Sequence, residues 1–225
     1  MGITLLGTSH IAQESKEQII NLLNNGTFSV VAVELDKDRL YAMLDKKKPK
    51  YSFSLIKKIG LNGFLFGVIG GWLSRKLGKS VGVMPGEDML TAVEEAQKRD
   101  IKVALIDQPI LYTLHRFSKE TSWRIYWQFI RDLFRSIFRK KKMMNELGLK
   151  NFDLHKVPSG KIVNMMIKYM EKSYPEVYSV LVEERNNYMA NQLKALNHMF
   201  PDKNILAVVG AGHVPGMKKL LGIKQ

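Results

Sequence analysis

A motif of glycine, two further residues and histidine occurs near both ends of the chain, and it constrains the fold more than any other feature. The motif is Gly-Thr-Ser-His at residues 7–10 and Gly-Ala-Gly-His at residues 210–213. Each copy follows a run of β-forming residues, at 3–6 and 205–209, and precedes a segment with helical character. Ligands of open α/β sheets bind beyond the carboxyl ends of the strands. If the two strands are neighbours, both histidines face one crevice.

Two further segments have the character of strands. Residues 29–35 are a nearly continuous apolar run rich in β-branched side chains, and residues 101–106 are a similar but shorter run. Such runs are typical of parallel strands buried on both faces. Helical patterns occupy residues 12–25, 36–44, 86–99, 123–138, 162–171 and 175–199. We therefore predict one α/β domain over residues 1–225, with a central, mainly parallel sheet and flanking helices.

Three charged residues stand where apolar residues are expected. Glu34 ends the second strand, and a buried carboxylate is costly unless it is paired or ligates a metal. Asp107 follows the third strand, where it is either an N-cap for the helix after Pro109 or a site residue. Arg185 lies on the apolar stripe of the helix at 175–199, so it needs a carboxylate, phosphate or substrate partner. The other residues of this stripe are Tyr178, Leu181, Val182, Met189, Leu193 and Leu196.

The strand ends predict a metal site. Two imidazoles and a carboxylate, drawn from His10, His213, Glu34 and Asp107, suit zinc, manganese, cobalt or iron(II). Glycines beside the histidines, at positions 7, 210 and 212, allow the backbone to approach a metal or substrate closely. The chain has no cysteine, so thiolate ligands are excluded. The other histidines, at positions 115, 155 and 198, lack the strand–turn context and are interpreted as structural or surface residues.

The net charge of +14 is concentrated in two segments. Residues 46–58 carry six lysines and no acid, and residues 116–142 carry nine basic residues and two acids. We expect both to belong to helical insertions that contact a membrane, over residues 46–82 and 116–160. Residues 59–73 are apolar and glycine-rich but too short to span a bilayer. They indicate a helical hairpin or a shallow membrane-contacting segment, or alternatively a helix packed on the core.

The segment at residues 123–138 is a basic amphipathic helix. Trp123 and Trp127 share its apolar side, and Arg131 and Arg135 its polar side. This pattern is typical of binding at an anionic membrane surface. Alternatively, the aromatic side packs on residues 59–73, and the two interpretations are compatible. The nearly neutral remainder of the chain argues against nucleic acid as the partner. Homo-oligomerisation and the side of the membrane stay open.

Several stretches along nearly the whole chain resemble the TraB family, the pheromone-shutdown family that includes TraB and PrgY. These stretches are Gly7-Thr8-Ser9-His10, Val33-Glu34-Leu35-Asp36 with Arg39, Pro85-Gly86-Glu87-Asp88-Met89, Leu105-Ile106-Asp107, Thr113-Leu114-His115-Arg116, Glu184-Arg185 with Tyr188-Met189-Ala190, and Val208-Val209-Gly210-Ala211-Gly212-His213. The family is related to the Tiki and GumN group of proposed metalloproteases. Two positions depart from the pattern: Gln108 stands where arginine is usual, and Asn186 where aspartate is usual.

The resemblance implies a divalent-metal-dependent hydrolase of peptidase type that acts on short hydrophobic signalling peptides at a membrane. His10, His213 and Glu34 would hold the metal. Glu184 is the expected general base, and Arg185 would clamp a substrate carboxylate or an oxyanion, with Asp107 and Ser9 as further substrate-binding residues. The alternative is a non-catalytic protein that binds and sequesters a pheromone peptide.

Overall fold

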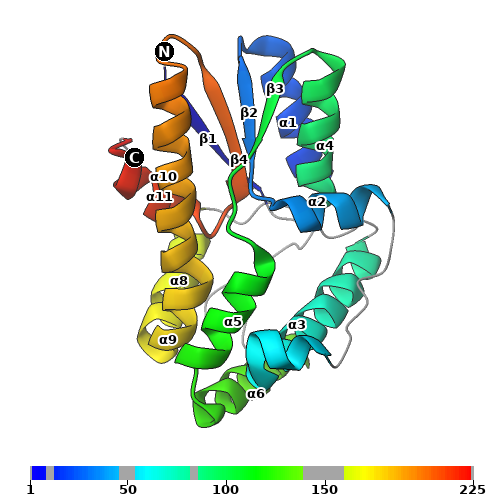
Figure 1. Cartoon of the computed structure of the whole chain (residues 1–225), viewed down its shortest axis with the longest axis vertical. Helices are drawn as coiled ribbons and strands as arrows, with labels where there is room; N and C mark the ends of the chain where they lie inside the picture. Colours follow the sequence, from blue (N-terminus) through cyan, green and yellow to red (C-terminus); the bar gives the residue numbers. More distant parts are fainter. Residues whose placement is uncertain (1, 9–12, 46–53, 82–85, 139–159, 224–225) are drawn as a thin grey trace.

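Four parallel strands form a single sheet at one end of the molecule (Figure 1). The computed structural model describes residues 2–8, 13–45, 54–81, 86–138 and 160–223. The strands are β1 (Ile3–Thr8), β2 (Val30–Val33), β3 (Lys102–Leu105) and β4 (Ile205–Gly210), in the order β1-β4-β2-β3. The predicted α/β class with a parallel sheet is confirmed.

The first and last strands are neighbours. In the register of β1 and β4, Thr8 lies opposite Gly210, so both motifs leave the sheet from adjacent strand ends. Both β1 and β4 are longer than predicted, because β1 continues through Thr8 and β4 through Gly210. Gly7 is therefore a strand residue rather than a turn residue. A Cβ at Gly7 would lie 2.8 Å from Val214 Cγ2, so the glycine allows the segment that follows β4 to pack closely against β1.

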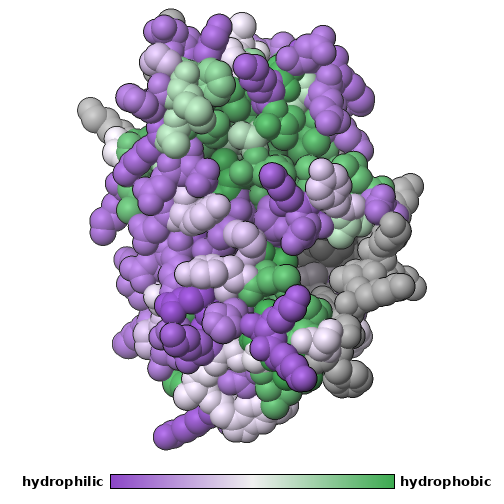
Figure 2. Space-filling view, in the orientation of Figure 1, coloured by the Kyte–Doolittle hydropathy of each residue, from purple (hydrophilic) through white to green (hydrophobic). Residues whose placement is uncertain are grey.

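Helices cover both faces of the sheet, which explains why its strands are apolar throughout. One face packs against α1 (Gln13–Asn25) and α4 (Glu87–Lys98), and the other against α10 (Glu184–Met199) and α11 (Val214–Leu221). Side chains of β4 alternate between the two layers: Leu206 and Val208 join the first, while Ile205, Ala207 and Val209 join the second. In the space-filling view the outward side of α10 is hydrophilic, and apolar residues gather beside it over the strands (Figure 2).

The start of α2 (Lys37–Leu44) lies at the carboxyl end of β2. Asp36 is its N-cap, and its Oδ1 accepts a hydrogen bond from the backbone N–H of Arg39 at 3.0 Å. The alternative that Asp107 caps the next helix is wrong. The cap position of α5 (Ile110–Glu120) is Pro109, without a side-chain hydrogen bond, because Asp107 lies two residues earlier and is held by arginines.

Beyond the carboxyl ends of the strands, the molecule is helical (Figure 1). Here α5 and α3 (Ser54–Val81) pack together with α6 (Trp123–Phe138), α8 (Gly160–Ser173) and α9 (Pro175–Tyr178). Phe66 of α3 stacks on Phe117 of α5 with ring centroids 4.2 Å apart. A Cβ at Gly63 would lie 2.2 Å from the Leu114 carbonyl oxygen, so this glycine permits the close helix contact.

These contacts confirm the alternative that residues 59–73 form a helix packed on the core. The helical hairpin is wrong, because residues 61–81 of α3 are continuously helical; the kink between the two helical parts of α3 lies at Gly60, where φ is +74°, at the start of the predicted segment. Among the described residues, no helix is long and apolar enough to cross a membrane. The predicted insertions at 46–82 and 116–160 are described in part, because residues 46–53 and 139–159 lie outside the described ranges.

The segment predicted as one helix over residues 175–199 contains a π-helical turn. This turn, η1 (Ser179–Glu183), joins α9 to α10. A π-turn inserts an extra residue, so the buried side of the helix is displaced upstream of it. Val182, Met189 and Leu193 are buried as predicted. Tyr178 and Leu181 are only partly buried, and Val177 and Val180 are fully buried in their place.

Candidate functional site

The carboxylate of Glu34 connects three elements at the carboxyl ends of β2 and β4. The Glu34 backbone N–H continues the sheet by donating to the Val208 carbonyl at 3.1 Å. Its side chain is 3% exposed, and its Oε2 accepts the Gly210 backbone N–H at 2.6 Å. Its Oε1 accepts from Arg185 Nη2 and lies 3.4 Å from His213 Nε2. Sheet register and side-chain bonds together fix the position of this buried charge.

Arg185 reaches the same point from α10, just after the π-turn. It donates two parallel hydrogen bonds to Asp107, from Nε to Oδ1 at 3.1 Å and from Nη2 to Oδ2 at 2.8 Å. Its Nη1 donates to the Leu181 carbonyl at 3.3 Å. Burial lowers the pKa of Arg185, but the charges of Glu34 and Asp107 outweigh that effect and raise the pKa above its usual value. The prediction that Arg185 faces the interior is confirmed, and its three guanidinium nitrogens are all engaged.

Arg39 supplies a second cation to Asp107. Its Nη1 donates to Asp107 Oδ2 at 2.9 Å, so this carboxylate lies between two guanidinium groups. Arg39 belongs to the first turn of α2, and 32% of its side chain is exposed. It is therefore the solvent-facing member of a network whose other charges are enclosed.

His213 precedes α11 and is buried beside Asn186 of α10. Its Nδ1 lies 2.7 Å from Asn186 Oδ1. An amide oxygen only accepts hydrogen bonds, so with Oδ1 facing the ring Nδ1 carries the proton. In a neutral imidazole Nε2 then presents its lone pair to Glu34 Oε1. A Cβ at Gly216 would lie 2.3 Å from Asn186 Nδ2, so glycine at 216 lets α11 approach Asn186.

This pair of electron donors fits a divalent cation. Two ligands with bonds of about 2.1 Å to one tetrahedral ion lie about 3.4 Å apart, which matches the separation of His213 Nε2 and Glu34 Oε1. Ligand histidines commonly donate their other N–H to an oxygen, as His213 does to Asn186. Among the described residues, no group of three histidine, aspartate or glutamate side chains forms a complete metal site. The predicted third ligand, His10, and the predicted substrate residue Ser9 lie outside the described ranges.

The structure places Glu184 in a different cluster. Its carboxylate accepts hydrogen bonds from Nε and Nη2 of Arg116, at 3.2 and 2.7 Å, and Arg116 also pairs with Glu120. The bond to Glu184 raises the pKa of Arg116. A cavity of about 270 Å³ adjoins this cluster. Glu184 contacts neither Glu34 nor His213 among the described hydrogen bonds and ion pairs, so the geometry gives no support to its role as general base.

Three other sequence positions have clear outcomes. Gln108 is buried, and its side-chain Nε2 donates to Thr113 Oγ1 of α5 at 2.8 Å, while its backbone N–H donates to Asp107 Oδ1 at 2.9 Å. Within the described ranges, a Cβ at Gly212 would meet Ile167 Cδ1 alone, at an ordinary 3.6 Å, so these residues leave room for a side chain there. Asn186, which departs from the family pattern, orients His213. The signal that the sequence offers for this role is an amide side chain directly after Arg185.

The fold and this site define an α/β protein with a charged, partly buried centre at the carboxyl edge of a parallel sheet. The model of the TraB/PrgY/gumN family matches residues 2–224, and the chain belongs to that family. It is 30% identical to the uncharacterized protein MJ1365 of Methanocaldococcus jannaschii, over 97% of this chain and 53% of that protein. It is 24% identical to the TraB domain-containing proteins of mouse and human, over 96% of this chain and 62% of each relative. The chain thus spans between half and two thirds of these relatives.

Proposed function

We propose that this chain is the catalytic unit of a divalent-metal-dependent hydrolase of metallopeptidase type that inactivates short hydrophobic signalling peptides. The observation that carries the proposal is the buried pair of His213 Nε2 and Glu34 Oε1, 3.4 Å apart, with Nδ1 of the histidine held by Asn186. His10, from the matching motif that follows the neighbouring strand, would be the third ligand. When bound, a divalent ion supplies a Lewis acid that polarises a carbonyl group and acidifies water.

The surrounding residues hold the two ligands in place. Asn186 fixes the ring orientation and tautomer of His213, and Arg185 holds the Glu34 carboxylate in one conformation. Asp107 in turn holds Arg185 with two bonds. Because the guanidinium nitrogens of Arg185 are engaged in this way, we assign it a positioning role in place of the expected substrate clamp.

Arg39 is the better candidate for recognising substrate. Only its Nη1 takes part in the described side-chain bonds, and a third of its side chain is exposed beside Asp107. A guanidinium with free donors binds a carboxylate through two parallel bonds. We therefore propose that Arg39 binds the terminal carboxylate of a short peptide at the mouth of the site.

Elemental analysis of protein purified without chelator tests the metal site. Stoichiometric metal is expected in the wild type, with loss in His213→Ala and His10→Ala. Asn186→Ala should bind the metal about 10–100-fold more weakly, the usual cost of losing such a supporting bond. His198→Ala removes an exposed histidine from the same helix as Asn186 and is the matched control. A wild type that contains no metal and refuses added manganese, cobalt and zinc would overturn the proposal.

Peptide binding tests the substrate side. Arg39→Gln should weaken binding of a hydrophobic peptide with a free carboxyl terminus and leave binding of the amidated peptide unchanged. Equal effects on both peptides would contradict the role of Arg39. Peptide binding that survives chelation, without cleavage by the metal-loaded protein, would instead favour a sequestering protein.

A further inference from the structure

The outer surface of α6 carries two parallel stripes that the site does not use. One is apolar and aromatic, and the other is mainly basic. Their members repeat at helical spacing and run side by side along the helix: Trp123, Trp127 and Phe134 in the first, and Arg124, Gln128, Arg131 and Arg135 in the second. A groove with a volume of about 840 Å³ lies between these stripes and Ile69 of α3. We call this surface, with Trp72 of α3, the α3–α6 face.

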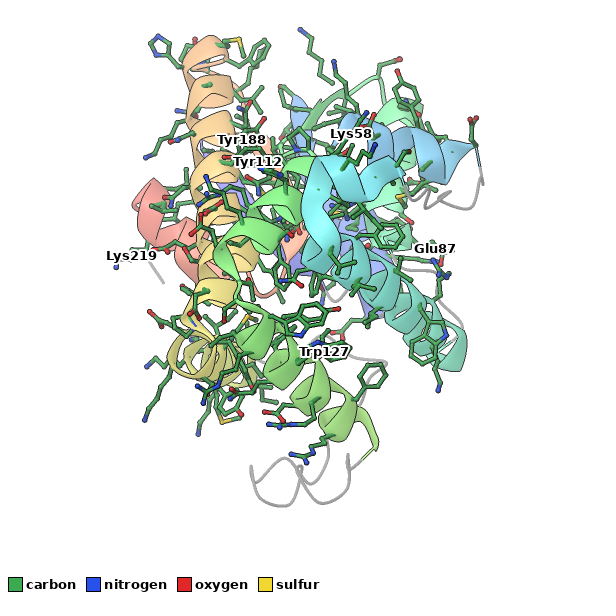
Figure 3. The ribbon with its side chains drawn as sticks, turned by 60° about the horizontal axis from the view of Figure 1, so that its bottom comes forward. Lys58, Glu87, Tyr112, Trp127, Tyr188 and Lys219 are labelled. Carbon is green, nitrogen blue, oxygen red and sulfur yellow. The ribbon has the colours of Figure 1, made fainter. Side chains whose placement is uncertain are left out.

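The α3–α6 face exposes far more aromatic surface than the fold requires. Tyr126 and Ile130 already bury the inner side of α6 against α5 and α9. The exposed fractions are 43% for Trp72, 48% for Trp123 and 45% for Trp127, and these are the three tryptophans of the chain. Figure 3, which turns the bottom of the molecule forward, shows Trp127 on α6 beside α3. Indole rings with one apolar and one polar side are enriched where proteins meet the membrane interface.

The positive charge of the α3–α6 face favours a membrane with anionic lipids. Arg124, Arg131 and Arg135 are exposed, and the ammonium of Lys76 lies 4.9 Å from the ring centre of Trp72. Asp132 is the acid of α6, and it is occupied by a hydrogen bond from the Tyr174 hydroxyl and by pairing with Arg131 and Arg135. These contacts lower the pKa of Asp132, with the Tyr174 bond the largest cause. An apolar surface flanked by arginine side chains complements anionic phospholipids, whose phosphate groups lie next to their acyl chains.

We propose that the α3–α6 face docks on the surface of an anionic phospholipid bilayer. Trp123 and Trp127 enter the interface between headgroups and acyl chains, while Arg124 and Arg131 contact lipid phosphates. The helices lie on the membrane and do not cross it, in keeping with their length and composition. This inference goes beyond the hydrolase proposal and does not depend on it, because none of these residues contacts Glu34 or His213 among the described residues.

The three tryptophans provide the test, since no other residue of the chain has their fluorescence. Protein is titrated with vesicles of phosphatidylcholine alone or of phosphatidylcholine with about 30% anionic phosphatidylglycerol. A shift of emission to shorter wavelength, and quenching by lipids brominated on the acyl chains, are expected only with the anionic vesicles. Raising the salt concentration should reverse much of the binding, because screened phosphates attract arginine less.

A charge-matched pair of variants locates the surface. Arg124→Gln with Arg131→Gln removes two exposed charges and should reduce the partition coefficient about 25-fold, since each basic residue near an anionic surface contributes roughly a factor of five. Lys194→Gln with Lys203→Gln removes two exposed charges elsewhere and should change binding little. Both pairs are exposed, so a thermal melt should verify unchanged folding.

Three results would overturn the proposal. The wild type could fail to bind anionic vesicles, it could bind neutral vesicles equally well, or the two double variants could lose binding to the same extent. Emission that shifts with protein concentration and is not quenched by brominated lipid would identify a second copy of the chain as the partner. Metal content is measured on the same samples, so that a failure of membrane binding can be distinguished from a failure of the hydrolase proposal.

Discussion

Glu184 and Arg185 are adjacent in sequence and both form ion pairs, but they belong to very different regions of the molecule. Arg185 lies in the enclosed network at the strand ends, where Glu34 and Asp107 are each 3% exposed. Glu184 pairs with Arg116 at the side of the helical end, where both side chains are about a quarter exposed and adjoin a cavity. One helical step of about 100° separates a buried charge network from an open one.

Burial makes the two networks energetically unequal. A buried ion pair contributes little net stability compared with an apolar replacement, but removing one partner leaves an uncompensated charge in a medium that solvates it poorly. An exposed pair remains solvated whether or not it forms, so its loss costs little. The same chemical groups therefore serve as a rigid support for Glu34 in one region and as a weak surface contact in the other.

The largest expected effect is that of Arg185→Met. It leaves the carboxylates of Glu34 and Asp107 without their shared cation, and we expect the free energy of unfolding to fall by about 3–5 kcal/mol. Urea unfolding at neutral pH measures this change. Glu34→Gln and Asp107→Asn added to Arg185→Met should recover part of the loss, because the unpaired charges are gone. A loss below about 1 kcal/mol would show that the network is solvated after all.

A smaller effect is expected at the open cluster. Arg116→Gln and Glu184→Gln should each lower the free energy of unfolding by less than about 1 kcal/mol, and a double-mutant cycle should give a coupling of similar size that decreases with salt. Glu184→Gln should also leave metal binding unchanged. A coupling above about 2 kcal/mol, or loss of metal in Glu184→Gln, would remove the distinction between the two clusters.

The contrast also shows what could be predicted from the sequence. The parallel sheet and the adjacency of its first and last strands followed from the apolar runs and the repeated motif, because strand burial and glycine turns leave local patterns. For Arg185 the sequence predicted a carboxylate, phosphate or substrate partner without naming the residue, since the register of four strands decides which carboxylates reach it. Glu184 was misplaced because its partner Arg116 lies 68 residues away on another helix.

The π-turn is the clearest limit on that prediction. A period of 3.6 residues was assumed throughout residues 175–199, and it placed Tyr178 and Leu181 on the buried side. The extra residue in η1 places Val177 and Val180 on the buried side instead of Tyr178 and Leu181, while Val182, Arg185 and Met189 keep their predicted side. No local sequence pattern marks a π-turn, which depends on packing at both of its ends. Asn186 was overlooked for a related reason, since its role depends on how closely α11 approaches at Gly216.

The smallest effect is expected at a buried group that is neutral, the hydroxyl of Tyr126. The hydroxyl of Tyr126 is fully enclosed in the helical end and has no hydrogen-bond partner among the described residues. Tyr126→Phe removes a polar atom whose desolvation is not compensated, so stability at neutral pH should be unchanged or higher by up to about 1 kcal/mol. Chemical unfolding measures the change, and Tyr41→Phe, at an exposed tyrosine, is the matched control.

The pH dependence of the same variant sharpens this prediction. Burial raises the pKa of Tyr126 to about 12, whereas a tyrosine in the unfolded chain ionises near 10.0. The unfolded state therefore loses its proton first, so the stability of the wild type relative to Tyr126→Phe is constant below about pH 10 and falls as the pH rises towards 12. The wild type should lose on the order of 2 kcal/mol more than Tyr126→Phe across that interval. Parallel alkaline curves for the two proteins would mean that the Tyr126 hydroxyl is hydrated, and the helical end would then be as open as the Arg116–Glu184 cluster beside it.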